Sequence, residues 1–270
     1  MFNSISMTQV AASIAHAMGA EAPNQAGHSI PMVDAFVETM LGGKKADRVL
    51  IYNPDCIGMW LYQKYTDLFI PVTNAVQLAV PAATVSPSWT PVCFASMYTG
   101  TLPEVHGIRS YVRPVITTDT LFDSLARSGK KAALVAVDNS SMALIFQNRE
   151  IDYYIEPDDA AATEKALELI PQDKYDLIAV YNQEYDDMEH RTSPESPEAL
   201  DALKRNIRDF GRLTDAVKAH WNGHDTLVCW ATDHGCHLIE EGEWKGHGTH
   251  GEDRPEDINV MHFYGIYPKK

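Results

Sequence analysis

The sequence has no long apolar run, and this absence limits where the protein can lie. None of the apolar stretches in its 270 residues approaches the ~20 residues that a membrane-spanning helix needs. The first residues, Met1 to Gly19, carry neither a basic start nor a clear apolar segment, so we expect no signal peptide. We therefore predict a cytoplasmic protein without a membrane partner.

Cysteine and positive charge are also scarce. The four cysteines show no CxxC spacing and lie in or beside apolar runs, which is typical of buried free thiols in a reducing compartment. With 22 Lys and Arg against 37 Asp and Glu, the formal net charge is -15, which argues against a nucleic-acid polymer or an anionic membrane as main partner. An anionic substrate would need local positive charge, which bound divalent cations could supply.

The rest of the composition is ordinary for a globular protein. Apolar runs typical of buried strands occur at Arg48 to Tyr52, Val76 to Ala82, Lys131 to Val137, Asp176 to Tyr181, Thr226 to Ala231 and Met261 to Tyr267. Helical patterns lie between most of them, which predicts an α/β fold with a mainly parallel central sheet and helices on both faces. We find no repeat or linker and expect a single domain over residues 1–270, with residues 1–45 as a helical extension packed on it.

Side chains that can bind metal follow several of these strands. Asp55 follows the first strong strand, and Asp233 and His234 follow a later one. Asp186 and His190 are four residues apart, a spacing that puts both on one helical face. Each group also has a simpler explanation, namely a helix cap, a strand-end turn and a surface ion pair.

A segment rich in hydroxyl groups becomes helical at Pro91. Proline is favoured at the first helical position, so we predict Thr90 as the N-cap. Because a helix N-terminus stabilises negative charge, Thr90 is also a candidate nucleophile. Thr84, Ser86 and Ser88 are neighbouring hydroxyls and stay as alternatives.

Glycines flank two histidines near the end of the chain, His247 and His250, and allow the backbone to come close to a site. We prefer His250 as the candidate ligand, with His247 as its alternative. The collected candidates are Asp55, Thr90, Asp186, His190, Asp233, His234 and His250. Because parallel strands end at one edge of a sheet, these groups could converge on two cations roughly 4 Å apart, an arrangement suited to phosphoryl transfer.

One motif makes this pattern specific, Thr99-Gly-x-x-Pro-x-x-His-Gly-Ile108. With the candidates above, it resembles the alkaline phosphatase superfamily, most closely the type I phosphodiesterase/nucleotide pyrophosphatase branch, from about Arg48 to Phe263. The resemblance implies an alkaline phosphatase-like fold. It also implies a nucleophile nine residues before this Thr, which is Thr90, and a structural position for His106 beneath the nucleophile turn.

The resemblance further implies a two-metal hydrolase of small phosphate esters. The two divalent ions would be zinc, with manganese as the alternative, and Thr90 would attack phosphorus to form a phosphothreonine. One ion would be held by Asp186, His190 and His250, and the other by Asp55, Asp233 and His234 with Thr90.

The substrate-binding positions depart from the family pattern. Phosphodiesterase-type relatives carry an Asn about twenty-one residues after the nucleophile, where this chain has Tyr111. Arg109 and Arg113 are close in sequence, so all three are candidates for substrate binding. An Arg clamp on a phosphoryl oxygen would favour a monoester over a diester.

Several other functions stay as alternatives to a phosphodiesterase. A phosphomonoesterase or a phosphonate hydrolase would have the same superfamily fold. A sulfatase would need Pro and Arg where this chain has Val92 and Phe94, and a phosphomutase would need a large cap domain, for which the chain leaves no room. The non-enzyme alternative is a metal-stabilised binding protein. The natural substrate, the metal and the oligomeric state are left open by the sequence.

Overall fold

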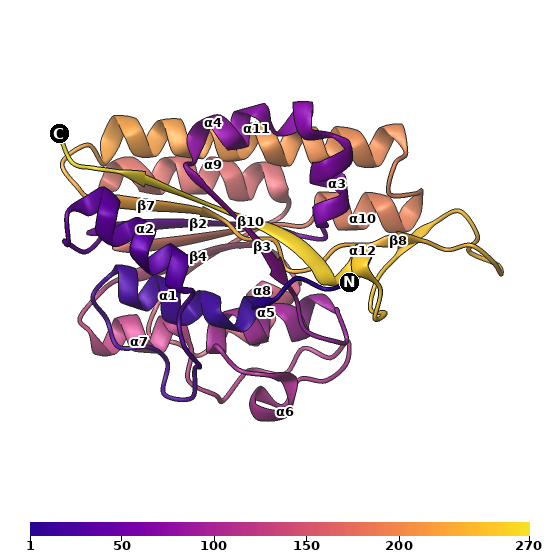
Figure 1. The fold of residues 1–270 in the computed structure, drawn as a ribbon, viewed down its shortest axis with the longest axis horizontal. Helices are drawn as coiled ribbons and strands as arrows, with labels where there is room; N and C mark the ends of the chain where they lie inside the picture. Colours follow the sequence, from indigo (N-terminus) through magenta and orange to yellow (C-terminus); the bar gives the residue numbers. More distant parts are fainter.

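An eight-stranded sheet runs through the middle of the molecule in the computed structural model, which describes residues 1–270 (Figure 1). Its strands lie in the order β1 (Ile5–Ser6), β3 (Leu78–Ala83), β10 (Asn259–Tyr267), β7 (Thr226–Trp230), β2 (Arg48–Pro54), β6 (Leu177–Asn182), β4 (Ala132–Val137) and β5 (Asp152–Glu156). Only β10 runs antiparallel to its neighbours, β3 and β7. The predicted mainly parallel sheet is therefore confirmed.

Helices cover both faces of this sheet, as predicted (Figure 1). One layer consists of α3 (Met59–Lys64), α4 (Ile70–Ala75), α9 (Asp159–Leu169), α10 (Glu184–Arg191) and α11 (Pro197–His220). The other consists of α1 (Val10–Ala17), α2 (Pro31–Leu41), α5 (Thr90–Thr99), α7 (Leu121–Arg127) and α8 (Ser141–Ile145). These layers and the sheet leave no separate cap domain. No helix is both long and apolar enough to cross a membrane.

The central strands are apolar on both faces, and this explains the three layers. In β2, Val49 and Ile51 belong to the core beneath one helical layer, whereas Leu50 and Tyr52 belong to the core beneath the other. Alternate side chains of a strand point to opposite faces, so a continuous apolar run requires cover on both sides. The four side chains are at most 1% exposed.

The start of α5 differs from the prediction by one residue. Thr90 is the first residue of the helix and Trp89 is the N-cap, so the prediction of Thr90 as the cap is wrong. The carbonyl of Trp89 accepts the N–H groups of Val92 and Cys93, each at 2.9 Å, and this moves the helix start back by one position. The Thr90 hydroxyl therefore does not cap the helix.

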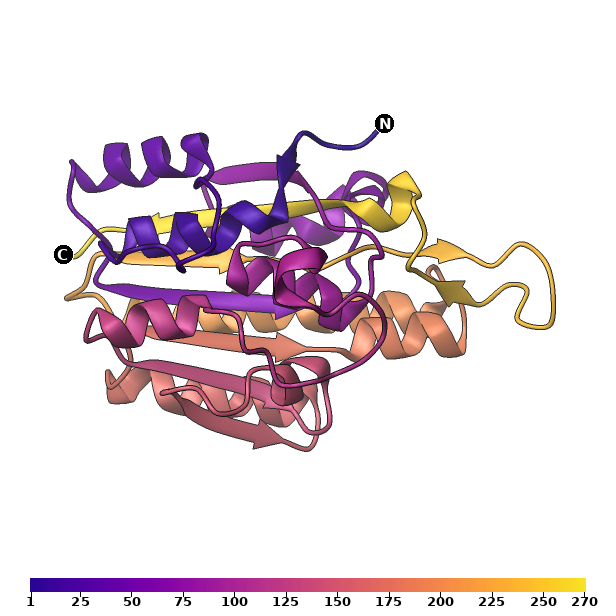
Figure 2. The ribbon, with the colours of Figure 1, turned by 90° about the horizontal axis from the view of Figure 1, so that it is seen from below.

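The parallel strands of the sheet end at a common edge, and a hairpin extends beyond it (Figures 1 and 2). This hairpin contains β8 (His237–Leu238) and β9 (Gly248–Thr249), and the short helix α12 (Pro255–Ile258) leads from it into β10. A further short helix, α6 (Pro103–His106), follows α5. We call this side of the sheet the carboxyl edge and the opposite side the amino edge.

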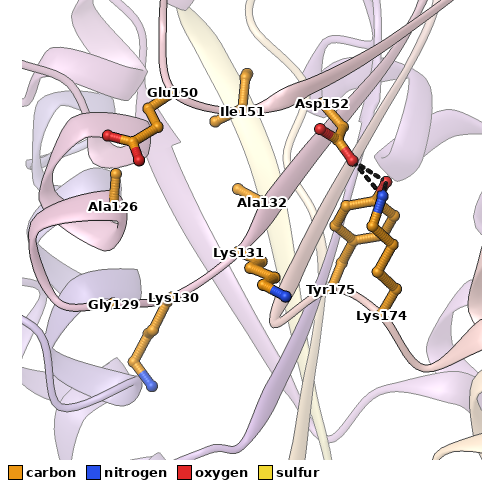
Figure 3. A pocket seen from close by; sticks show the side chains of 10 residues that line it. All are labelled: Ala126, Gly129, Lys130, Lys131, Ala132, Glu150, Ile151, Asp152, Lys174 and Tyr175. Atoms are coloured by element: carbon orange, nitrogen blue, oxygen red, sulfur yellow. Dashed lines mark hydrogen bonds and ion pairs between the residues drawn. The ribbon is translucent and has the colours of Figure 1, made fainter.

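The amino edge contains a hollow of about 470 Å³ (Figure 3). Lys131 lies just before β4, Asp152 begins β5, and Lys174 and Tyr175 lie just before β6. The Lys174 ammonium contacts Asp152 Oδ2 at 2.5 Å and the Tyr175 hydroxyl at 2.9 Å. The charged groups that line this hollow thus partly neutralise one another.

Candidate functional site

The carboxyl edge brings all seven candidate residues together from five separate segments. Asp55, Asp233 and His234 form one group whose ligand atoms lie within 4.8 Å of one another. A second such group contains Asp186, His190 and His250, together with Glu189. The two groups adjoin each other, because the rings of His234 and His250 stack with centroids 3.9 Å apart. The Thr90 hydroxyl lies 3.2 Å from His234 Nε2, beside both groups.

The ends of β2, β6 and β7 position the first group. Asp55 directly follows β2, and its N–H donates to the carbonyl of Asn182 at the end of β6. Tyr181, also in β6, donates its hydroxyl to Asp55 Oδ2. Asp233 lies just past β7, and its Oδ1 accepts the N–H of Cys56 at 3.1 Å. Adjacent parallel strands therefore place the two aspartates side by side.

Helix α10 and the strand β9 position the second group. Asp186 and His190 lie one helical turn apart in α10, as predicted, with Asp186 Oδ1 3.5 Å from His190 Nε2. The same oxygen lies 3.5 Å from Nε2 of His250, which follows β9. His247 points elsewhere, because its Nδ1 contacts the carbonyl of His190 at 2.9 Å.

All three histidines present the same ring nitrogen to the site. Their Nδ1 atoms contact backbone carbonyls: His190 with Gly248 at 3.1 Å, His234 with Gly235 at 3.1 Å, and His250 with Ser88 at 2.7 Å. A carbonyl only accepts, so each Nδ1 carries a proton and each Nε2 has a free lone pair. This is the tautomer in which protein histidines bind metal ions through Nε2.

Buried charge dominates the electrostatics of the site. Burial and the neighbouring carboxylate of Asp186 raise the pKa of Asp55 well above its ordinary value, and burial raises the pKa of Asp186 to about 8. Burial and the charge of Asp55 also raise the pKa of Asp233. Burial lowers the pKa of His234, and that of His250 to about 3. The imidazoles are thus neutral and do not offset the carboxylates.

The carboxylates keep oxygen atoms free for a further partner. Asp55 Oδ1, Asp186 Oδ1 and Asp233 Oδ2 are buried and have no hydrogen-bond partner. A buried unpaired carboxylate oxygen is costly unless a cation or a donor meets it. Together with three free imidazole lone pairs, these oxygens form a mixed N/O set that fits divalent cations such as zinc or manganese.

The Thr90 hydroxyl lies where negative charge is favoured. It is the first residue of α5, at the positive end of the helix dipole, and it is 4% exposed. Trp89 packs against His250 with ring centroids 5.0 Å apart, and Tyr111 packs edge-on against Trp89 at 6.1 Å. These two aromatic rings therefore flank the groups around Thr90.

The three candidates for substrate binding have different surroundings. Tyr111 is 58% exposed beside Trp89. Arg113 lies over the Tyr111 ring at 5.9 Å and donates to the carbonyl of Asn139 at 2.5 Å. Arg109 donates to the carbonyl of Glu104 at 3.3 Å. Both guanidinium groups thus bind backbone carbonyls outside the two ligand groups.

His106 lies against the helix that carries Thr90. Its Nδ1 accepts the N–H of Ile108 at 3.2 Å, so its proton is on Nε2 and is donated to Ser96 Oγ in α5 at 2.8 Å. Burial lowers the pKa of His106 to about 4. These contacts connect α6 to α5 at Ser96, away from the end of the helix that carries Thr90.

Two polar residues of the site, Tyr181 and Glu189, were not among those predicted from the sequence. Tyr181 binds Asp55, but it reads as one more apolar residue of a buried strand. Glu189 reads as an exposed helical residue beside His190, yet it is 0% exposed. The burial of Glu189 could have been predicted from the helical repeat. Glu189 lies four residues after Tyr185, an aromatic side chain that should face the core.

Comparison with known proteins identifies the family. The sequence model of the family described as type I phosphodiesterase / nucleotide pyrophosphatase matches residues 74–247, well over half of the chain. This range includes Thr90, the whole of α10, and Asp233 with His234; Asp55 and His250 lie outside it. No curated protein sequence matches the chain.

Solved structures of the alkaline phosphatase superfamily have a similar fold. The phosphonoacetate hydrolase of Sinorhizobium meliloti 1021, in complex with phosphonoformate, matches with a TM-score of 0.55 and 16% identity over 76% of this chain and 61% of that chain. Murine ectonucleotide pyrophosphatase/phosphodiesterase 5, in complex with AMP, matches with a TM-score of 0.55 and 19% identity over 72% of this chain and 58% of that chain. A 2-O GAG sulfatase matches with a TM-score of 0.57 and 13% identity over 82% of this chain and 64% of that chain.

The chain is shorter than these proteins and spans about three fifths of the length of the first two. The fold, the matched residues and the arrangement at the carboxyl edge nevertheless agree with one assignment. The chain belongs to the type I phosphodiesterase/nucleotide pyrophosphatase family of the alkaline phosphatase superfamily.

Proposed function

We propose that this protein hydrolyses phosphate esters with two divalent cations and with Thr90 as the nucleophile. The observation that carries the proposal is the position of the Thr90 hydroxyl, 3.2 Å from His234 Nε2 and beside two groups of unpaired carboxylates and free imidazole nitrogens. Asp186, His190 and His250 would hold one ion, and Asp55, Asp233 and His234 would hold the other with Thr90. Zinc suits this mixed N/O set, with manganese as the alternative.

The two cations, when bound, would lower the pKa of the nucleophile and stabilise charge on the attacking and leaving oxygens. Thr90 Oγ1 attacks phosphorus, and the Oγ1–P bond forms as the bond from phosphorus to the leaving oxygen breaks. The proton that the Thr90 hydroxyl gives up is matched by one taken up from solvent on the leaving oxygen, so the leaving group departs as an alcohol. Water then attacks phosphorus and the Oγ1–P bond breaks. One proton of the water restores the Thr90 hydroxyl, and a diester substrate leaves as a phosphate monoester.

The residues around Thr90 would position it for this attack. The start of α5 favours negative charge on Oγ1, because the helix dipole is positive there. His106 binds Ser96, which lies six residues after Thr90 in α5, and so helps to hold the helix in place. The backbone bonds to the three Nδ1 atoms fix each imidazole with Nε2 towards the ligand groups.

A diester is the better substrate class for this geometry. A monoester carries one more negative charge and would gain most from an arginine clamp. Arg109 and Arg113 instead bind the carbonyls of Glu104 and Asn139, and neutral Tyr111 is the third candidate. The family match also supports a diester, and the phosphonate hydrolase similarity makes a phosphonate the main alternative.

The test is an activity panel on wild type and Thr90→Ala. The substrates are bis-p-nitrophenyl phosphate, p-nitrophenyl phosphate and phosphonoacetate, each with zinc or manganese after treatment with a chelator. We expect metal-dependent turnover of the diester, and a loss of at least ~1000-fold in Thr90→Ala with metal content near that of wild type. Undiminished turnover in the variant would rule out Thr90 as the nucleophile.

Thr99→Ala is the matched control, because Thr99 is a buried threonine at the other end of α5. Its hydroxyl donates to the carbonyl of Ala95, away from the ligand groups. We expect this variant to keep most of its activity. Metal binding without turnover of any substrate would favour a non-catalytic binding protein.

A further inference from the structure

A third group of potential ligands lies directly behind the proposed pair of metal sites. It consists of Cys56, Glu189 and Cys236, whose ligand atoms lie within 4.8 Å of one another. All three residues are 0% exposed, and Cys56 Sγ lies 3.9 Å from Glu189 Oε1. We call this group the thiol cluster. Glu189 and Cys56 also lie within 4.8 Å of ligand atoms of the proposed pair, but none of the three is assigned to either of its two ions.

Glu189 has no positively charged partner in this environment. The basic group nearest to its carboxylate is the imidazole of His190, whose Nδ1 lies 3.1 Å from Oε1. Its Oε2 atom is buried and has no hydrogen-bond partner. A buried carboxylate in such a position is costly unless a cation or a donor meets it.

The two oxygens of this carboxylate have different surroundings. Oε1 lies 3.1 Å from His190 Nδ1 and 3.9 Å from Cys56 Sγ. Oε2 lies against Gly248 and has no hydrogen-bond partner. This free oxygen is therefore available to a cation that the two thiols also bind.

The backbone around the thiol cluster holds its members in place. Cys56 has a φ of 66°, a left-handed conformation that is strained for a residue with a side chain, and its N–H donates to Asp233 Oδ1. The carbonyl of Cys236 accepts the indole N–H of Trp60 at 2.9 Å. Gly248 leaves room for the carboxylate, because a Cβ atom there would lie 1.4 Å from Glu189 Oε2. Such features are found where side chains are held for binding.

We propose that Cys56, Cys236 and Glu189 bind a third divalent cation, zinc, at a structural site. Two thiolates and one carboxylate are ligands that zinc takes in tetrahedral sites, while manganese and magnesium prefer oxygen. Each thiol releases its proton to solvent as the ion binds. The Tyr185 hydroxyl, 3.8 Å from Cys236 Sγ, supplies a further oxygen beside the ion. The ion connects the end of β2, α10 and the segment after Gly235.

Cobalt substitution tests this site separately from the proposed catalytic pair. The protein is stripped with a chelator and loaded with Co²⁺ without oxygen, and bound cobalt is counted per chain while the absorption spectrum is recorded. The catalytic pair has only N and O ligands, so it gives no sulfur-to-cobalt charge-transfer band. We expect three cobalt ions per chain and a strong band of this kind in the near ultraviolet.

Two variants and one control sharpen the result. We expect Cys56→Ser/Cys236→Ser to bind two cobalt ions without the band, and Glu189→Gln to bind the third ion at least ~10-fold more weakly. Cys229→Ala removes a buried thiol in β7, outside the thiol cluster, and should keep both the band and the stoichiometry. Because the wild-type spectrum alone can decide the question, the test does not depend on the folding of a variant.

Three results would overturn the third site. Two cobalt ions without the band would leave the proposed hydrolase intact and remove the thiol cluster as a metal site. Two cobalt ions with the band would make Cys56, which also lies within 4.8 Å of ligand atoms of Asp186 and His234, a ligand of the catalytic pair. Only two titratable thiols in the unfolded, unreduced protein would indicate a disulfide between Cys56 and Cys236.

Discussion

The two edges of the central sheet differ in whether their carboxylates have a cationic partner. At the amino edge, Arg48 contacts Asp173 at 3.0 Å and Asp176 at 2.8 Å, and Lys174 contacts Asp152 at 2.5 Å. Each of these carboxylates has a cation beside it and is at least a quarter exposed. Such pairs are complete within the chain and contribute modestly to stability.

At the carboxyl edge, by contrast, the buried acids of the candidate site have no Lys or Arg partner, although partly exposed acids of α10 do. Asp55, Asp233 and Glu189 are at most 1% exposed, and the free oxygens of the two aspartates lie 3.4 Å and 3.2 Å from the neutral imidazole of His234. Acids that are buried without cations indicate that the edge is completed by something bound. The candidate site therefore differs from the ordinary charged surface by having acids without a balancing cation, and not by having more charge.

The largest expected effect is a loss of catalytic activity when one carboxylate of the carboxyl edge is replaced, compared with the same replacement at the amino edge. Asp233→Asn removes a carboxylate of the carboxyl edge, and we expect it to lower kcat/KM for bis-p-nitrophenyl phosphate by at least ~100-fold, because a metal ligand is lost. Asp173→Asn is the same change at the amino edge and should leave the rate within ~2-fold. Asn tolerates the φ of 51° at position 173, so this control should fold normally. Equal rates in the two variants would remove the functional distinction between the edges.

Acid should destabilise the protein through His106 at the carboxyl edge. Its folded pKa is about 4 against an ordinary 6.5, so between these values the folded state binds fewer protons than the unfolded state. Its contribution is fully present above pH ~6.5 and is lost as the pH falls towards 4, by at most ~3 kcal/mol. Urea unfolding at several pH values should show a weaker acid dependence in His106→Gln.

His224 is the matched control for this prediction at the amino edge. Its side chain is a quarter exposed, whereas His106 is buried. Because this substitution removes no buried imidazole, we expect His224→Gln to keep most of the acid dependence of wild type. An unchanged profile in His106→Gln would show that other groups are responsible.

The smallest expected effect concerns the amino edge itself. Arg48→Met removes the cation between Asp173 and Asp176, and since the Arg48 side chain is only 15% exposed, we expect a loss of about 1 kcal/mol in the free energy of unfolding. Catalytic activity should not change. Lys204→Met, which breaks an exposed pair with Asp201, should cost less than ~0.5 kcal/mol. A large loss of activity in Arg48→Met would contradict the separation of the two edges.

The candidate site could be predicted from where its residues lie relative to strands, helices and the Thr99 motif, and not from any single motif. Asp55 and Asp233 could be placed because each directly follows an apolar run, and the ends of such strands meet at one edge. Asp186 and His190 could be paired because four residues make about one helical turn. Thr90 was found from its spacing to the Thr99 motif, although its helix begins one residue earlier than predicted.

The thiol cluster could not be predicted in this way. Cys56 and Glu189 are each one residue from a candidate ligand, and Cys236 is two residues after His234. A residue next to a ligand normally points away from it, so this spacing does not predict a shared site. Only the left-handed backbone at Cys56 and the tight approach of Gly248 to Glu189 bring them together. The antiparallel direction of β10 was equally invisible, because an apolar run does not record its direction.

The sequence by itself determined the order of strands and helices along the chain, the burial of both faces of the sheet and the set of polar groups at the strand ends. These properties depend on local periodicity and composition, which a chain carries before it folds. Only the tertiary structure decided which nitrogen of each histidine faces the site and which carboxylates remain without a partner. Those properties depend on distances between segments far apart in sequence, and such distances exist only after the sheet has formed.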